Sequence, residues 1–518
     1  MTVEAQSSDV QTLHSLGYAQ ELLRRMSGFS NFAVSFTIIS ILSGCLTLYG
    51  FGMNTGGPVS MNIGWPLVGI MVTLVGLAMA EVCSSYPTAG GLYYWSAKLA
   101  GKNGPAWSWF TGWFNLLGQI GVTAGIDFGL AFFASALLNL LFGYPTTPPF
   151  IILIYGIVLF LHGLLNTFGV RLVALLNDIS VWWHLIGVVV IVGALLILPS
   201  HHQSPSFIFT HFVNNTGWDF PLAPVYVFLL GLLLAQYTFT GYDASAHMTE
   251  ETENAAVAGP RGIVMSIVVS LVAGWVLLIG VTSAIGDYAK EAAAVVPPAQ
   301  IFVDAVGHNL GVFLLFIVVG AQFYCGMSSV TANSRMIYAF SRDGAVPGSR
   351  FWHSINKRTR TPTNSIWLAA VGAFILGLPY LWSPVAYAAV TSIAVIGLYI
   401  AYGIPILLRL RAGDSFQRGP WHLGRWSRLV GTIAVVWIAF IAVLFVLPQV
   451  YPITLTTFNY SIVAVAVVVI GTGVWWLVSA RNWFRGPRVQ GTPEELAAIE
   501  DDLGEQGGRP VPAGAVGS

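Results

Sequence analysis

Long apolar stretches alternate with short polar segments along the chain. A helix needs about 20 mostly apolar residues to cross the hydrocarbon core of a bilayer, and twelve stretches approach or exceed that length. The pattern therefore predicts an all-α integral membrane protein with twelve transmembrane helices, near residues 32–53, 64–86, 105–141, 149–169, 178–199, 222–247, 262–285, 310–340, 363–381, 384–408, 429–448 and 458–480.

The basic residues orient these helices. Arginine or lysine precedes predicted helix 1 and follows predicted helices 2, 4, 6, 8, 10 and 12, whereas the remaining loops contain only Lys290. Because loops rich in lysine and arginine stay on the cytoplasmic side, we expect both termini in the cytoplasm and the chain in the plasma (inner) membrane.

Composition narrows the class of function. Charged residues make up 8% of the chain, whereas soluble domains carry about 25%. The sequence contains neither a G-x-x-x-x-G-K-[ST] nor an H-E-x-x-H motif, and it lacks the repeated filters or charge rings that channels use. We therefore predict a carrier that is not an enzyme, with no cofactor, no resident metal and no nucleic-acid partner. A substrate sensor built on a transporter fold is the alternative.

Two apolar helices contain a weak segment. Predicted helix 1 contains "SILSGC" and predicted helix 6 contains "TFTGYDAS". Glycine, serine and threonine weaken a helix, and irregular backbone at membrane depth survives only where it is buried in protein or lines a cavity. Weak segments at corresponding positions of two halves are typical of the binding site of an inverted-repeat transporter. For Gly44 alone, the alternative is a small-residue face for close helix packing.

The segments then arrange into two repeats with flanking parts. We expect the following order: a cytoplasmic N-terminal segment at 1–31, repeat 1 at 32–199, an extracellular loop at 200–221, repeat 2 at 222–408, two peripheral helices at 429–480 and a tail at 481–518. The tail is acidic and rich in glycine and proline, which is typical of disorder.

Four stretches carry a resemblance to a known family: "FTIISILSGCLTLYGFGMNTGGP", "AEVCSSYPTAGGLYYW", "TGYDASAHMTEETENAAVAGPRGI" and "SSVTANSRMIYAFSRDGAVP". With them the chain resembles the amino acid–polyamine–organocation superfamily, and within it the branch of amino-acid, GABA and choline permeases. The resemblance implies a 5+5 inverted-repeat (LeuT-type) fold with helices 1 and 6 broken. It also implies import of a small amino acid or GABA-like compound by alternating access, with choline or polyamine transport as the alternative.

The resemblance also implies a substrate site at the two breaks. The substrate carboxylate is expected to meet backbone amides at Ile41, Ser43, Gly44 and Cys45, and its amino group to meet carbonyls at Tyr237, Phe239, Thr240, Gly241 and Asp243. Such an arrangement agrees with the helix dipole, because a helix N-terminus favours an anion and a C-terminus a cation. Gln119 and Ser392 are further candidates for the pocket.

Ion coupling has two candidate locations. His184 occupies what resembles the position of a lysine that replaces sodium in proton-linked relatives, and histidine titrates near physiological pH. The alternative is an interfacial histidine beside Trp182 and Trp183. Ser328 and Ser329 could instead supply oxygen ligands to sodium, or bond to their own helix. We favour protons over sodium.

Three further ionisable sites lie in or beside the apolar helices. Asp127 in helix 3 either attracts a substrate amine or proton, or lies at the outer water interface. Asp243 either contacts substrate or caps the re-formed part of helix 6. His247 and the acidic run "TEETE" are expected to form a solvated cytoplasmic gate with Arg261 or Arg335.

Aromatic residues flank the helix-6 break. Tyr237, Phe239 and Tyr242 could stack on an ammonium group. If the three rings form a cage, choline or a polyamine becomes a plausible substrate.

Overall fold

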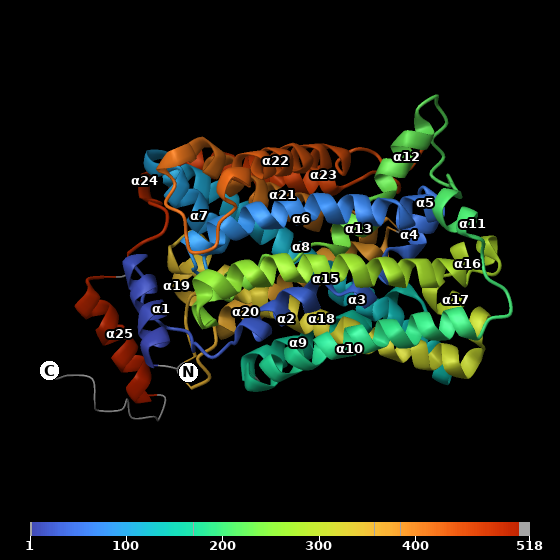
Figure 1. Ribbon diagram of the computed structural model, residues 1–518, viewed down its shortest axis with the longest axis horizontal. Helices are drawn as coiled ribbons and strands as arrows, with labels where there is room; N and C mark the ends of the chain where they lie inside the picture. Colours follow the sequence, from blue (N-terminus) through green and yellow to red (C-terminus); the bar gives the residue numbers. More distant parts are fainter. Residues whose placement is uncertain (1–2, 169, 357, 384, 490, 507–518) are drawn as a thin grey trace.

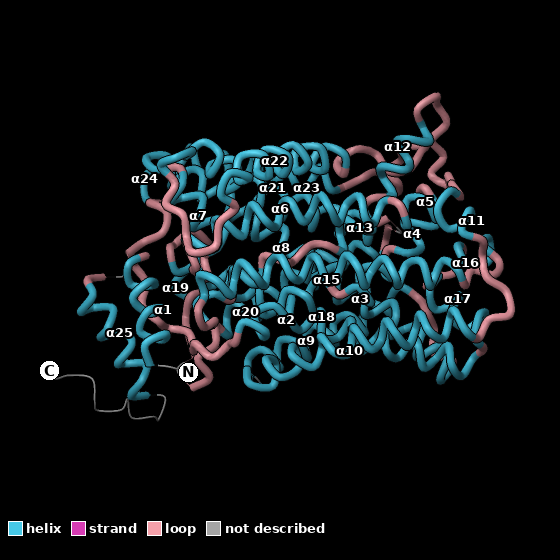
Figure 2. The backbone as a smooth tube through the Cα atoms, viewed as in Figure 1, coloured by secondary structure: helices cyan, strands magenta, loops and turns pink. Residues whose placement is uncertain are grey.

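The computed structural model describes residues 3–168, 170–356, 358–383, 385–489 and 491–506 (Figure 1). Helices dominate these residues, and the described chain has no strand beyond three isolated bridges (Figure 2). Residues 169 and 384, at predicted helix ends, and residues 507–518 of the predicted tail lie outside the described part.

Twelve apolar helical segments match the twelve predicted ones in order. Within the described residues, eleven are long and apolar enough to cross a membrane, and the remaining one is the shorter segment Ala223–Thr238. The prediction of an all-α membrane protein is therefore confirmed. Segments 1 to 5 comprise α2 (Gly28–Ile39) with α3 (Ile41–Thr47), α6 (Gly64–Ser85), α8 (Gly104–Phe142), α9 (Pro148–Phe168) and α10 (Val170–Ile197).

Segments 6 to 12 complete the bundle. They comprise α12 (Ala223–Gly231) with α13 (Leu233–Thr238), α15 (Ala255–Ser283), α18 (His308–Arg342), α20 (Thr363–Gly377), α21 (Ala386–Ala412), α22 (Ser427–Leu444) and α23 (Ser461–Trp475). Short helices connect them: α4 (Tyr49–Asn54), α5 (Gly57–Asn62), α7 (Gly91–Leu99), α11 (Pro205–Thr210), α14 (Ala244–His247), α16 (Tyr288–Ala292), α17 (Pro297–Val306), α19 (Ser349–Trp352) and α24 (Arg481–Trp483).

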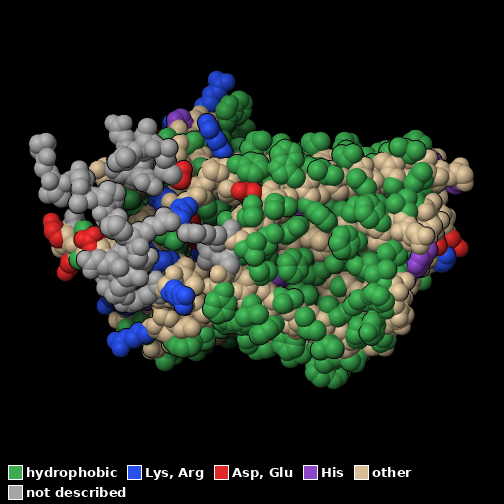
Figure 3. Space-filling model, turned by 90° about the horizontal axis from the view of Figure 1, so that it is seen from below, with side chains coloured by type: hydrophobic (Ala, Val, Ile, Leu, Met, Phe, Trp, Pro, Cys, Tyr) green, Lys and Arg blue, Asp and Glu red, His purple; other side chains and the backbone are tan. Residues whose placement is uncertain are grey.

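The long helices lie side by side, and both chain ends emerge at the same end of the bundle (Figure 1). We call this end the terminal face and the opposite end the far face. On the side of the bundle that Figure 3 shows, hydrophobic side chains cover most of the surface between the two ends, and charged side chains gather mainly at the terminal face. This distribution is the one that a bilayer imposes, because lipid tails accept apolar groups and exclude charged ones.

Both predicted breaks are present, which confirms that helices 1 and 6 are discontinuous. Ser40 separates α2 from α3 and has a φ of 38°. Helix 6 stops at Thr238, before the 247 that we expected, and resumes only as the one-turn α14. Gly241 between them has a φ of 93°, a left-handed conformation that glycine adopts without steric cost.

Helices α8 and α21 cross at the centre of the bundle with their backbones almost in contact. A Cβ on Gly118 would lie 2.5 Å from the Leu398 nitrogen, and one on Gly397 would lie 2.7 Å from the Gly118 nitrogen. Only glycine permits this approach. The crossing brings neighbouring side chains of both helices to the helix-6 break.

The expectation of a disordered tail is wrong for residues 493–506. They form α25 (Pro493–Gln506), which lies against α1 (Val3–Ser15) (Figure 1). The Glu500 carboxylate accepts a hydrogen bond from the backbone amide of Gln20 at 2.6 Å and lies 2.8 Å from the His14 ring. The two chain ends are therefore joined at the terminal face.

Replacing Gly241 by alanine tests the geometry of the helix-6 break. The added Cβ would collide with Ile38 of α2, and the left-handed conformation costs on the order of 1–3 kcal/mol without glycine. Gly143→Ala is the matched control, because Gly143 has a φ of 72° and nothing within 4 Å of the added Cβ. We expect Gly241→Ala to lower the melting temperature in detergent more than the control does, because overpacking adds about 1–3 kcal/mol. Equal shifts would contradict the close packing at Gly241.

Candidate functional site

The two breaks lie against each other in the buried core, and we call residues 40–45 and 237–243 together the double break. A Cβ on Gly44 would lie 2.6 Å from the side chain of Thr238. The Ser35 hydroxyl donates to the Tyr242 carbonyl at 2.9 Å. Gly44 therefore serves as a close-packing position as well as a member of the break.

Helices 5 and 8 contact the break in helix 1. The His184 Nε2 lies 2.7 Å from the Ser40 hydroxyl, and its Nδ1 lies 2.7 Å from the Ser180 carbonyl. The Cys325 thiol donates to the Ile38 carbonyl at 3.2 Å. His184 is fully buried, so the alternative of an interfacial histidine is wrong.

The tautomer of His184 follows from its partners. A carbonyl only accepts, so Nδ1 carries a hydrogen toward Ser180, and Nε2 of the neutral ring accepts from the Ser40 hydroxyl. If the ring took a second proton, Nε2 would donate to the Ser40 hydroxyl instead of accepting from it. The protonation of His184 and the direction of a hydroxyl at the helix-1 break are thus linked.

The four positions predicted to meet a substrate carboxylate begin α3. Ile41, Ser43, Gly44 and Cys45 are all buried. The amides of Ser43 and Gly44 both donate to the Ser40 carbonyl at 2.8 Å. A ligand that accepts hydrogen bonds from these two amides would therefore replace the bonds that they make to the Ser40 carbonyl in the first turn of α3.

The rings near the helix-6 break point in different directions. Phe239 packs on Trp65 of α6 with ring centroids 4.4 Å apart, and Tyr242 packs on Tyr402 of α21 at 5.0 Å. The Tyr237 hydroxyl lies against Gly125 of α8. The three rings do not form the cage that would favour choline or a polyamine.

Asp243 lies at the point where α8, α21 and helix 6 meet. Its carboxylate accepts hydrogen bonds from the Gln119 amide and the Tyr402 hydroxyl, each at 2.7 Å, and lies 3.2 Å from the His247 Nε2. Thus Gln119 and Asp243, both predicted for the pocket, are brought together. The other pocket candidate, Ser392, accepts from Gln449 at 3.0 Å.

Several buried polar groups around the helix-6 break have no hydrogen-bond partner in the described part of the chain. They are the amide of Gln236 and the hydroxyls of Tyr237, Tyr242 and Tyr399, although Tyr399 lies close enough to Tyr242 and Gln236 to interact with both. An unpaired buried polar group costs about 1–3 kcal/mol. Their concentration at one place favours a polar ligand there.

The double break is closed from both ends of the bundle. A pocket of about 600 Å³ opens at the far face and reaches Leu46 and Thr47. Another pocket of about 600 Å³ lies near the terminal face and is lined by Asn177, Glu251 and Arg335 among others. Residues 237–243 line neither pocket, so the structure is closed around the site.

Asp127 is buried inside the bundle and pairs with a histidine. Its Oδ1 lies 3.1 Å from the Nδ1 of His162 on α9, and neither side chain is exposed. The alternative of an aspartate at the water interface is therefore wrong. Gly326 of α18 makes the room, because a Cβ there would collide with both residues.

The two serines predicted for sodium point to different helices. Ser328 donates to the Asn177 side chain of α10, whereas the Ser329 hydroxyl lies 2.8 Å from that of Thr123 on α8. A shared ion needs oxygens that converge on one point. The two hydroxyls do not converge here.

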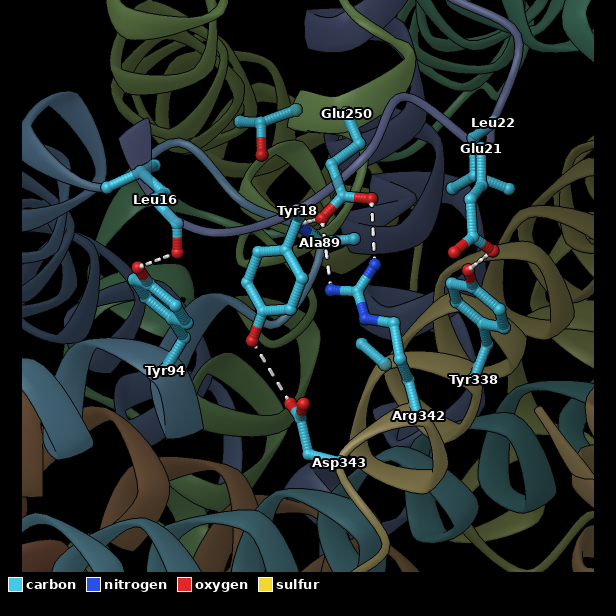
Figure 4. Close-up of polar contacts among 12 residues, drawn as sticks. Leu16, Tyr18, Glu21, Leu22, Ala89, Tyr94, Glu250, Tyr338, Arg342 and Asp343 are labelled. Atoms are coloured by element: carbon cyan, nitrogen blue, oxygen red, sulfur yellow. Dashed lines mark hydrogen bonds and ion pairs between the residues drawn. The ribbon is translucent and has the colours of Figure 1, made fainter. Parts of the chain in front are cut away.

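Two ion pairs lie at the terminal face, and Figure 4 shows the one between Glu250 and Arg342. Glu250 pairs with Arg342 at 3.3 Å, and Glu251 pairs with Arg335 at 2.8 Å. The prediction of Arg335 as a partner of the acidic run is confirmed. Arg261 is exposed, and the expectation of a solvated run is wrong because Glu250 is buried.

Residues 16–26 lie across these ion pairs, and we call them with the two pairs the terminal gate. Figure 4 shows Tyr18 donating to Asp343 at 3.2 Å and Tyr338 donating to Glu21 at 2.5 Å. The Arg342 guanidinium stacks 3.9 Å above the Tyr18 ring. Because these contacts join the N-terminal segment to helix 8, opening the terminal face requires this segment to move.

Burial acts against the charge of Asp343 in this gate. It raises the pKa of the Asp343 carboxyl, and the neighbouring Arg342, the Arg488 amide and the hydroxyls of Tyr93 and Tyr18 oppose that rise. The carboxyl therefore accepts hydrogen bonds from three separate parts of the chain.

Comparison with known proteins agrees with this geometry. The family profile described as "Amino acid permease" matches residues 26–470. The chain belongs to the amino acid permease family. It is a multi-pass membrane permease of the amino acid–polyamine–organocation superfamily and not an enzyme.

Similar proteins cover nearly the whole permease. It is 46% identical to "Amino-acid permease BAT1" of Arabidopsis thaliana, over 92% of this chain and 95% of that protein. It is 45% identical to "Amino-acid permease BAT1 homolog" of Oryza sativa subsp. japonica, over 92% and 94%. The "GABA-specific permease" of Saccharomyces cerevisiae is 32% identical, over 93% of this chain and 86% of that one.

Sequence reasoning missed three partners in the permease. His162 lies about as far into helix 4 as Asp127 lies from the end of helix 3, so antiparallel packing places them at one depth. Asp243 and His247 are four residues apart, the spacing that brings two side chains to one helix face. Tyr402 had no such signal, because only the α8–α21 crossing brings it to Asp243.

Gly326→Ala tests whether the permease depends on the Asp127–His162 pair. The new methyl group would displace the pair, and overpacking costs about 1–3 kcal/mol. Gly473→Ala is the control, because nothing lies within 4 Å of a Cβ there and alanine favours a helix by up to about 1 kcal/mol. We expect Gly326→Ala to lower the melting temperature in detergent and Gly473→Ala to leave it unchanged or raise it. An unchanged melting temperature for Gly326→Ala would rule out tight packing around the pair.

Proposed function

We propose that the permease is a secondary active transporter that imports a small amino acid or a GABA-like amino compound, coupled to protons. Its terminal face is then cytoplasmic and its membrane the plasma membrane, as the loop charges indicate. The observation that carries the proposal is the double break, where two interrupted helices meet with unpaired polar groups. The names of the relatives, an amino-acid permease and a GABA-specific permease, support this substrate class.

A zwitterion fits between the two breaks. Its carboxylate would accept hydrogen bonds from the backbone amides at the start of α3, at Ile41, Ser43, Gly44 and Cys45. These bonds would replace the ones that Ser43 and Gly44 make to the Ser40 carbonyl. Its amino group would donate hydrogen bonds to backbone carbonyls of residues 237–241. The α3 N-terminus favours the anionic end and the end of α13 the cationic end.

Alternating access would move two repeats, residues 32–199 and 222–408, about this site. The pockets at the two faces are then the ends of the outward and inward paths, each closed in turn. Helices α22 and α23 lie outside the repeats. Gln119, Asp243 and Ser392 would reach substrate only by exchanging their present partners.

His184 is the proposed coupling residue. When its ring takes a proton, Nε2 changes from acceptor to donor and frees the Ser40 hydroxyl hydrogen to turn toward the substrate site. Asp127, held by His162, is a second candidate carrier of a proton. The divergence of Ser328 and Ser329 favours protons over sodium.

Uptake by purified permease in liposomes tests substrate and coupling together. Labelled amino acids, GABA, choline and putrescine are offered under a pH gradient and then under a sodium gradient. A gradient of about one pH unit supplies about 1.4 kcal/mol per proton, enough for about tenfold accumulation. We expect that accumulation for one amino acid or GABA, and none with His184→Ala, which still exchanges substrate. His308→Ala, at an exposed histidine, should behave as the unmodified protein.

Other outcomes revise separate parts of the proposal. Uptake driven by sodium and lost in Ser328→Ala or Ser329→Ala would contradict the His184 coupling. Uptake of choline or putrescine alone would overturn the substrate class. Substrate binding without uptake or counterflow would indicate a sensor instead of a carrier.

A further inference from the structure

His247 is held at both ring nitrogens in a fully buried position just after the helix-6 break. Its Nδ1 lies 2.9 Å from the Ala89 carbonyl, and its Nε2 lies 3.2 Å from Asp243 Oδ2. The carbonyl can only accept, so Nδ1 carries a hydrogen. A neutral ring would then direct the lone pair of Nε2 at a carboxylate oxygen.

Two lone pairs at this distance repel, so one proton belongs between His247 and Asp243. It lies either on Nε2 or on the Asp243 carboxyl, and the two groups share it. Donors from Gln119 and Tyr402 at 2.7 Å stabilise the carboxylate. Without the proton, the pair would be a buried carboxylate with no cation beside it, which is strongly unfavourable.

Asn115 can partner the pair in either state. Its Nδ2 lies 3.4 Å from His247 Nε2, and its Oδ1 has no partner. Since a half-turn exchanges the donor and the acceptor of an amide, Asn115 can donate to a bare Nε2 or accept from a protonated one.

One residue, Ala89, connects this pair to the terminal gate. The Ala89 carbonyl accepts from His247, and the Ala89 amide donates to Glu250 Oε1 at 2.9 Å. Glu250 in turn pairs with Arg342 (Figure 4). A Cβ on Gly91 would lie 3.1 Å from the His247 ring, so the loop at 89–91 packs directly on it.

We propose that Asp243 and His247 form a proton site that keeps the terminal gate closed while it holds one proton. When the proton leaves to water at the terminal face, Nε2 and the carboxylate repel, the ring turns away and its bond to Ala89 is lost. The loop at 89–91 then separates from Glu250 and the gate opens. The role of this site rests on the proposed transport function, but the test below does not require transport.

In the described part of the chain, the ionisable groups around the pair are paired, exposed or phenolic, apart from Asp343 of the terminal gate, whose carboxyl accepts from the Arg488 amide and from two tyrosines. Helix α2 brings no ionisable side chain, and the only one on α15, Arg261, is exposed. On α18, Arg335 and Arg342 are each paired with a glutamate. The remaining ionisable neighbours are the phenols of Tyr242, Tyr399 and Tyr402, which keep their protons near neutral pH.

Opening can be measured at Thr88, which is buried beside Ala89. Thr88→Cys in nanodiscs is labelled with a maleimide between pH 6 and 8.5, and its rate is divided by that of Ser415→Cys, an exposed position of the terminal face. This ratio removes the pH dependence of thiol chemistry itself, and the protein without either new cysteine gives the background. We expect the ratio to rise several-fold with pH.

Variants assign the titration to the pair. In His247→Gln and in Asp243→Asn the ratio should no longer depend on pH. His353→Gln, at a histidine stacked on Tyr338, should keep the pH dependence. A ratio that is constant in the parent, or that still rises with pH in His247→Gln, would overturn the proposal.

A milder variant keeps the proposal testable if His247→Gln or Asp243→Asn fails to fold. Tyr402→Phe keeps the ring packing but removes one donor to the Asp243 carboxylate. The proton is then held more tightly, and the midpoint should move upward by about one pH unit. An unchanged midpoint would count against the pair. A moved midpoint in a protein that fails the uptake assay would leave the proton site standing and the transport proposal wrong.

Discussion

Backbone that leaves a helix inside a membrane must find new hydrogen-bond partners, because lipid offers none. This requirement organises the permease. The interruption at Ser40 survives because His184 and Cys325 supply contacts from helices 5 and 8. The interruption in helix 6 survives because Ser35 of helix 1 bonds its backbone and because α8 and α21 cross closely enough to hold Asp243.

In the proposed mechanism, the same contacts make the site responsive to protons. Each break is next to a histidine whose one nitrogen is fixed by a carbonyl and whose other nitrogen faces a group that can change its role. At helix 1 that group is the Ser40 hydroxyl, and at helix 6 it is the Asp243 carboxylate. A change of one proton at either place therefore alters the backbone support of the break.

The sequence was sufficient for features that depend on local chemistry. Apolar length predicted the twelve segments, and small polar residues predicted both breaks. The sequence did not predict the exact end of helix 6, because α13 stops where Gly241 turns and not where apolar residues end. Contacts between helices that are distant in the sequence could not be predicted from the sequence either. Tyr402 reaches Asp243 only because α8 and α21 cross at Gly118 and Gly397. For Asp127, burial inside the bundle overrode the expectation of an interfacial acid, since His162 supplies the partner.

The joining of α1 to α25 has a practical consequence for handling the protein. Affinity tags and fluorescent fusions are usually placed at chain ends on the assumption that the ends are remote from function. In this permease the N-terminal segment is part of the terminal gate, and the C-terminal helix rests on it through Glu500. A bulky fusion at either end would therefore act on the gate, whereas the 200–221 segment at the far face offers an attachment point away from it.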